Sequence, residues 1–128
     1  MKYIFISIFL FTISIQTSFG QSFTCDFDYG VRTNKDTNKF ETIFEKDGLE
    51  TMKATYINDG ENSRVIGANG TSSLIALEGL DRIDFVEFTE SGNNNYTTIF
   101  FDDNSIVHSR HLKLLGMLFV GQFYGTCK

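Results

Sequence analysis

IDFVEFTESGNNNYTTIFF (residues 83–101) contains two apolar runs separated by the polar segment 91–95. β-Branched and aromatic residues dominate both runs, as they do in β-strands. In the second run, Thr97, Ile99 and Phe101 share one side, because successive side chains of a strand point to opposite faces. The stretch therefore predicts two antiparallel strands joined by a short turn.

The first of these runs changes its hydrophobic phase. Ile83 and Phe85 fall on one face of a strand, whereas Val86 and Phe88 fall on the other. A β-bulge inserts one residue into a strand and thereby reverses the facing of the residues that follow. We therefore expect a bulge near Phe85.

Short alternating runs recur through the rest of the chain. Residues 30–39 are polar and are expected to form a loop, and 69–70 is an Asn-Gly pair that favours a hairpin. No apolar pattern with a helical period persists. The predicted fold is all-β, an antiparallel sandwich or small barrel of about seven or eight strands. The first strand is expected to direct four residues to one face: Phe23, Cys25, Phe27 and Tyr29.

The N-terminus has the layout of a secretory signal peptide. Lys2 supplies a positive charge, residues 3–15 are almost wholly apolar, and the small residues Ser18 and Gly20 lie three and one positions before Gln21. The apolar run is shorter than the roughly 20 residues that a membrane-spanning helix needs. We expect residues 1–20 to be removed, leaving 21–128 as a single β domain that is exported to the periplasm or the medium.

Export guides the interpretation of the two cysteines, Cys25 and Cys127. An even number of cysteines in an exported chain favours a disulfide. A bond between them would join the first strand to the last and close a long loop. In the chain-entropy model, a loop of about 100 residues corresponds to about 4.7 kcal/mol of stabilisation.

The charge of the mature chain excludes some classes of partner. Without residues 1–20, the chain has 10 basic and 16 acidic residues, a net charge of −6. Nucleic acids and anionic membrane surfaces are bound by basic faces, so we expect neither as a partner. No later apolar stretch is long enough to span a bilayer, and we expect no integral membrane segment after cleavage.

The segment 107–111, VHSRH, contains both histidines and is the strongest candidate for chemistry. In a strand, His108 and Arg110 share one face and His111 points the opposite way. A regular strand cannot direct both histidines to one metal ion, and no third ligand has a suitable spacing. We therefore expect no metal and no cofactor.

A catalytic interpretation of the same segment stays open as an alternative. Two histidines and an arginine can supply a base, an acid and a cation that stabilises developing negative charge. The corresponding function is a small phosphodiesterase-like hydrolase that uses His108, Arg110 and His111.

Two N-glycosylation sequons begin at Asn69 and Asn95. Both fall in predicted turns, where a glycan could be accepted. They are relevant only if the chain comes from a eukaryote.

The C-terminal half contains V-H-S-R-H at 107–111 and Q-F-Y-G-T-C at 122–127. With these two motifs it resembles an uncharacterised family of small exported bacterial proteins, in which tyrosine usually stands in place of Phe123. The resemblance implies export, bacterial origin and a paired cysteine. It implies no catalytic residues.

We therefore expect a non-enzymatic exported module that binds a protein partner, an envelope component or a small ligand. Besides the hydrolase, the other alternative is a structural envelope protein. Such a protein would have an exposed sheet edge and would associate with itself.

Overall fold

A computed structural model describes residues 20–36, 39–45, 52–90 and 92–128. The predicted signal peptide thus lies outside the described residues, apart from its last position. In the described part of the chain, no helix has the length and hydropathy needed to cross a membrane. One short 3-10 helix is described, η2 (Gly60–Asn62). The strands are β1 (Gln21–Asp36), β2 (Lys39–Glu45), β3 (Lys53–Asn58), β4 (Arg64–Gly67), β5 (Gly70–Ser73), β6 (Ile75–Glu78), β7 (Arg82–Phe88), β8 (Asn94–Phe100), β9 (Ser105–Leu114) and β10 (Met117–Cys127).

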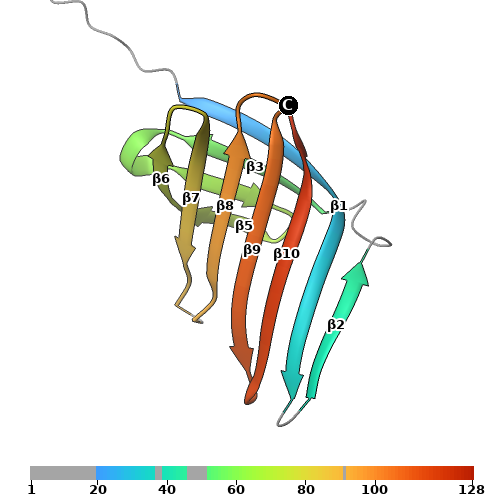
Figure 1. Ribbon diagram of the computed structural model, residues 1–128. Helices are drawn as coiled ribbons and strands as arrows, with labels where there is room; N and C mark the ends of the chain where they lie inside the picture. The colour runs from blue at the N-terminus through green and yellow to red at the C-terminus, as the bar shows by residue number, and fades with distance from the viewer. Residues whose placement is uncertain (1–19, 37–38, 46–51, 91) are drawn as a thin grey trace, which may run out of the picture.

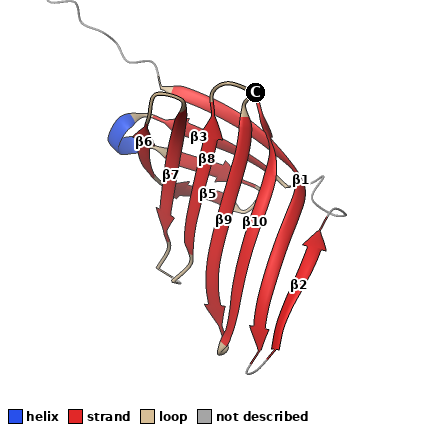
Figure 2. Ribbon diagram, viewed as in Figure 1, coloured by secondary structure: helices blue, strands red, loops and turns tan. Residues whose placement is uncertain are grey.

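These strands form one antiparallel sheet that curls into a nearly closed barrel (Figure 1). Their order is β5-β4-β3-β1-β10-β9-β8-β7-β6, and β2 pairs with β1 outside this path. The end strands β5 and β6 follow each other in the chain with Leu74 between them. The backbone N–H of Leu74 donates to the carbonyl of Ser63 at 2.8 Å, which ties this junction to the start of β4. The predicted antiparallel all-β fold is confirmed (Figure 2), and the described residues form ten strands, more than predicted.

β1 changes its partner along its 16 residues. Gln21–Asp26 pair with β3 and Gly30–Asp36 pair with β2, while β10 pairs with the opposite edge. The prediction of a loop over residues 30–39 is therefore wrong for residues 30–36 and for Lys39, the first residue of β2, while residues 37–38 lie outside the described residues. Strands on both sides hold this segment through backbone hydrogen bonds, which do not depend on side-chain polarity.

A β-bulge separates the two halves of β1. The register with β10 shifts between Phe27 and Tyr29, so Asp28 is the additional residue. Phe27 is buried, whereas Tyr29 is exposed and its ring centroid lies 6.1 Å from that of Tyr124. The prediction that Tyr29 shares the face of Phe27 is wrong, because the extra residue reverses the facing.

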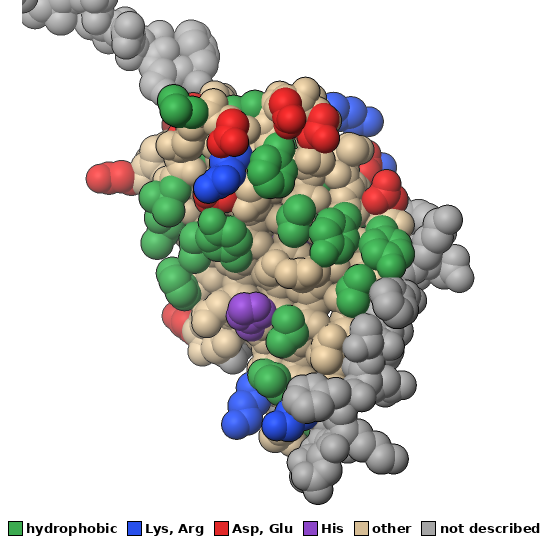
Figure 3. Space-filling model, in the orientation of Figure 1, with side chains coloured by type: hydrophobic (Ala, Val, Ile, Leu, Met, Phe, Trp, Pro, Cys, Tyr) green, Lys and Arg blue, Asp and Glu red, His purple; other side chains and the backbone are tan. Residues whose placement is uncertain are grey.

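β7, in contrast, is regular. It pairs with β6 and β8 without a register shift from Arg82 to Phe88, so the predicted bulge near Phe85 is wrong. Strand alternation instead directs Phe88 outward, where it is 68% exposed, and directs Glu87 inward. Hydrophobic side chains are accordingly visible on the outer face of β6–β10 (Figure 3).

Inward-facing side chains of β7, β8 and β9 lie in cross-strand rows. The first row is fully buried and apolar: Ile83, Ile99 and Ile106. The second row is mixed: Phe85, Thr97 and His108. The third row is polar: Glu87, Asn95 and Arg110. The interior of the barrel therefore changes from apolar to polar along its length.

The Cys25–Cys127 disulfide joins β1 to β10. The two residues are direct partners in the ladder, with their Cα atoms 4.0 Å apart. Next to them, Thr24 and Lys128 exchange both backbone hydrogen bonds, each at 2.9 Å. The prediction that the cysteines connect the first and last strands is confirmed, and both sulfur-containing side chains belong to the buried core.

Candidate functional site

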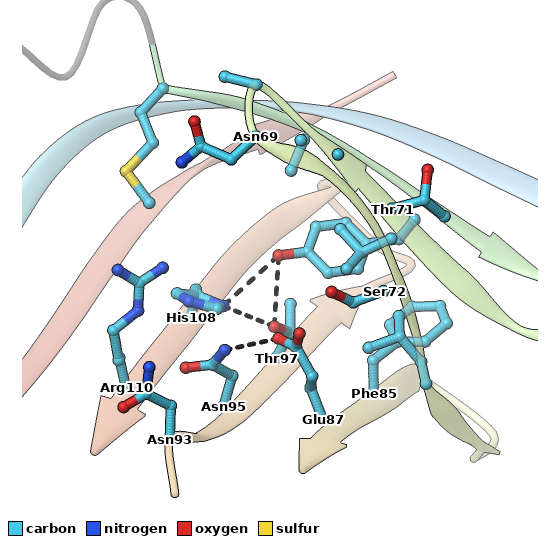
Figure 4. A pocket seen from close by; sticks show the side chains of 18 of the residues that line it. Asn69, Thr71, Ser72, Phe85, Glu87, Asn93, Asn95, Thr97, His108 and Arg110 are labelled. Atoms are coloured by element: carbon cyan, nitrogen blue, oxygen red, sulfur yellow. Dashed lines mark hydrogen bonds between the residues drawn. The ribbon is translucent and has the colours of Figure 1, made fainter. Parts of the chain in front are cut away.

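A cavity of about 570 Å³ lies inside the barrel (Figure 4). Side chains of β3, β4 and β5 line one side, and those of β7, β8 and β9 line the other. Pockets for small molecules usually measure about 300–1,000 Å³, so the volume suits such a ligand. Part of the wall is apolar and includes Phe27, Tyr56, Leu74 and Phe85.

His108, Thr97 and Tyr56 form a buried triangle of hydrogen bonds in this cavity (Figure 4). Thr97 Oγ1 lies 2.7 Å from His108 Nδ1, and the Tyr56 hydroxyl lies 3.4 Å from each of these two atoms. Thr97 and His108 are direct partners across β8 and β9, while Tyr56 reaches them from β3. The triangle fixes the imidazole ring and leaves its Nε2 buried with no hydrogen-bond partner among the described residues.

The triangle of His108, Thr97 and Tyr56 is uncharged at neutral pH. Burial, followed by the nearby charge of Arg110, lowers the pKa of His108 from 6.5 to about 4, while Glu87 acts in the opposite direction. Burial also raises the pKa of Tyr56 above its usual 10.0. A neutral imidazole donates from one nitrogen and accepts at the other. His108 can therefore offer a ligand either a donor or an acceptor, according to its tautomer.

Glu87, Asn95 and Arg110 form a polar row beside this triangle. Asn95 pairs with Glu87 across β7 and β8, and with Arg110 across β8 and β9. Its Nδ2 donates to Glu87 Oε2 at 2.5 Å, while its Oδ1 is buried and has no partner in the described chain. Asn93 Oδ1 is also buried without a hydrogen-bond partner among the described residues. No ion pair joins Arg110 to a carboxylate of the described residues.

The structure brings together only part of the cluster predicted from VHSRH. His108 and Arg110 line the cavity, and Arg110 is also exposed to solvent. His111 is exposed and does not line the cavity, as regular strand alternation requires. The arrangement of both histidines and Arg110 at one site, which the hydrolase alternative needs, is not formed. Among the described residues, no group of three or more His, Cys, Asp or Glu side chains could hold a metal ion.

The sequon asparagines lie in different surroundings. Asn69 lies in the turn between β4 and β5, as predicted. Asn95 lies in β8 and is only 9% exposed, so its predicted place in a turn is wrong. A side chain that points into the cavity and bonds to Glu87 cannot carry a glycan in the folded protein.

Sequence reasoning missed the cavity side chains Tyr56, Glu87, Asn95 and Thr97 as site residues. The signal that could have identified them is the alternation of inward-facing and outward-facing positions, which continues past the apolar residues of each strand into polar ones. Counting in steps of two from the buried Ile83 leads to Glu87, and counting back from Ile99 leads to Thr97 and Asn95.

Comparison of the chain with protein-family models, curated proteins and solved structures found no match.

Proposed function

We propose that this chain is an exported, non-enzymatic domain that binds a small ligand in the barrel cavity. The supporting observation is that buried polar atoms without protein partners line this cavity. His108, whose Nε2 lacks a partner, is 6% exposed, and Asn95, whose Oδ1 lacks one, is 9% exposed. An unsatisfied buried polar group costs about 1–3 kcal/mol. A bound ligand would satisfy both atoms and offset this cost.

The surroundings of these groups favour recognition over proton transfer. A general base works best when its pKa lies near the pH of the reaction, whereas the pKa of His108 is about 4. The carboxylate of Glu87 is hydrogen-bonded to Asn95 and does not orient a histidine. A fixed set of donors and acceptors around a preformed cavity is typical of small-molecule binding sites.

The proposed location is the periplasm or the extracellular medium. The Cys25–Cys127 disulfide supports it, because such bonds persist in oxidising compartments. The signal-peptide layout of residues 1–20 supports it independently. The proposed bacterial origin rests on the C-terminal resemblance alone.

Saturation-transfer NMR with a low-molecular-weight extract of the source organism tests the proposal. Gly67 faces the cavity, and a Cβ atom added there meets no atom within 4 Å, so Gly67→Phe can fill the cavity without a backbone clash. Its neighbour Ile66 is 43% exposed, and Ile66→Phe is the matched control. We expect wild type and Ile66→Phe to bind components of the extract and Gly67→Phe to lose this binding.

Two results would contradict the proposal. One is the absence of any saturation transfer from wild-type protein to the extract. The other is unchanged binding by Gly67→Phe, provided that its circular dichroism spectrum matches that of wild type.

A further inference from the structure

The unpartnered atoms of the cavity restrict the chemistry of its ligand. Asn95 Oδ1 and Asn93 Oδ1 are acceptors, and the Glu87 carboxylate accepts a hydrogen bond from Nδ2 of the same Asn95 side chain. Arg110, the cross-strand partner of Asn95, contributes only donors. His108 Nε2 supplies one more donor or acceptor. A ligand must therefore present hydrogen-bond donors and acceptors within a short distance of each other.

Charged head groups satisfy only half of this arrangement. A ligand carboxylate or phosphate offers acceptors alone and would face the amide oxygens of Asn93 and Asn95 together with the negative charge of Glu87. A ligand ammonium offers donors alone and would lie close to the positive charge of Arg110. A hydroxyl group both donates and accepts without bringing a charge into the cavity.

We infer that the ligand is a neutral polyhydroxylated molecule about the size of a sugar ring, an inference that rests on the proposed function. Several adjacent hydroxyls can satisfy Asn95, His108 and Arg110 together, each with its own partner. The apolar wall formed by Tyr56 and Phe85 can pack against the C–H face of such a ring. The cavity of about 570 Å³ has room for it.

Sugars that differ only in charge provide the test. The probes are D-glucose, D-galactose, D-mannose and myo-inositol as neutral polyols, D-glucuronate as the anion, D-glucosamine as the cation, and octanoate as an apolar acid without hydroxyls. Binding is measured by saturation-transfer NMR and isothermal titration calorimetry on the disulfide-bonded mature protein. We expect at least one neutral polyol to bind at least tenfold more tightly than every charged probe.

Variants of β8 connect this binding to the cavity. Asn95→Leu removes the buried acceptor, and we expect a loss of affinity of about tenfold, because one hydrogen bond to a buried group is worth about that much. Asn94→Leu changes the exposed neighbour and should leave binding unaltered. Glu87→Gln keeps the side-chain shape and is the second variant if Asn95→Leu fails to fold. We expect it to weaken the binding of a neutral ligand by less than about tenfold.

Failure of this inference can be told apart from failure of the proposed function. If extract components bind in the cavity but every neutral polyol fails, the ligand class is wrong and the binding function stands. Preferential binding of a charged probe or of octanoate, or a loss larger than tenfold for Glu87→Gln, overturns the ligand class in the same way. If neither the extract nor any probe binds wild type, both are wrong.

Discussion

Asn95 and Arg110 are direct partners across β8 and β9, and both side chains line the cavity. Their strand neighbours Asn94 and His111 are also direct partners, and both are exposed. The same two strands thus direct the pair Asn95 and Arg110 toward the cavity, with Asn95 buried and Arg110 also exposed to solvent, and direct the pair Asn94 and His111 away from it. This arrangement separates the effects of the cavity from those of the surface, because each inward residue has an outward neighbour as its control.

Stability is predicted to fall in mild acid because of His108. The unfolded chain binds a proton at this residue near pH 6.5, whereas the folded protein does so only near pH 4. The free energy of unfolding therefore decreases as the pH drops through this interval, by about 3 kcal/mol in total. Urea denaturation at a series of pH values measures the slope. Among the residues that the structure describes, the ionisable groups near the ring are Arg110, Glu87 and Tyr56.

Matched histidine variants assign this slope to one residue. His108→Gln removes the buried imidazole, so its stability should change much less between pH 6.5 and pH 4. His111→Gln removes the exposed imidazole of the same strand and should keep the wild-type slope. Equal slopes for wild type and His108→Gln would show that the buried ring is not the origin of the acid sensitivity.

The hydroxyl of Thr97 is predicted to stabilise the fold through His108. Thr97→Val keeps the side-chain shape but removes the contact to His108 Nδ1 at 2.7 Å, which leaves that nitrogen only the longer contact of 3.4 Å with the Tyr56 hydroxyl. We expect a loss of about 0.5–1.5 kcal/mol, the usual net contribution of one hydrogen bond. Thr97→Ser restores the hydroxyl and should recover most of the loss in thermal or urea unfolding. If Val and Ser variants are equally stable, the hydrogen bond makes no net contribution.

Reduction of the disulfide is predicted to destabilise the domain strongly. Cys25 and Cys127 are separated by 102 positions. For a closed loop of about 100 residues, the chain-entropy model gives about 4.7 kcal/mol. Urea unfolding of wild type with and without a reductant measures the difference, and the double variant Cys25→Ala/Cys127→Ala controls for other effects of the reductant. Overlapping unfolding curves for the oxidised and reduced protein would contradict the prediction.

Gly125 is predicted to be irreplaceable in β10. A Cβ atom at this position would lie 1.9 Å from the backbone oxygen of Asp26, next to the bulge in β1. Overpacking usually costs about 1–3 kcal/mol. Because a backbone atom cannot move aside cheaply, we expect Gly125→Ala to lower the free energy of unfolding by more than about 2 kcal/mol. Gly67→Ala is the control, since nothing lies within 4 Å of its added Cβ. Similar melting temperatures for the two variants would refute this.

Much of the fold was predictable from local pattern. Alternation placed Ile83 and Phe85 on one face of a strand and Thr97 and Ile99 on one face of the next, and all four are buried. The Asn69-Gly70 turn lies where the sequence indicates. The bulge at Asp28 was not predictable, because Phe23 to Tyr29 shows an unbroken alternation while the irregularity arises from pairing with β10. The polar composition of residues 30–36 likewise led to the wrong prediction of a loop, because this strand is formed by pairing with β2 and β10 and not by local pattern.

The site was harder to predict than the fold. A polar cavity reverses the usual pattern, so Glu87 faces inward while its apolar neighbours Val86 and Phe88 face outward. The sequence indicates this reversal only as a break in hydrophobic phase, which a bulge explains equally well. His108 and Arg110 were identified because they share a strand face, whereas Tyr56 reaches them from β3 through the closure of the barrel.

The most direct test of a ligand site inside the barrel is NMR chemical-shift mapping of the mature, disulfide-bonded protein. A titration with the extract fraction or sugar that binds best should shift resonances of the cavity residues Glu87, Asn95, Thr97, His108 and Arg110. The exposed residues of the outer face, such as Leu77, Phe88 and Tyr96, should remain unchanged. Shifts confined to these outer residues, with the cavity unaffected, would contradict the account.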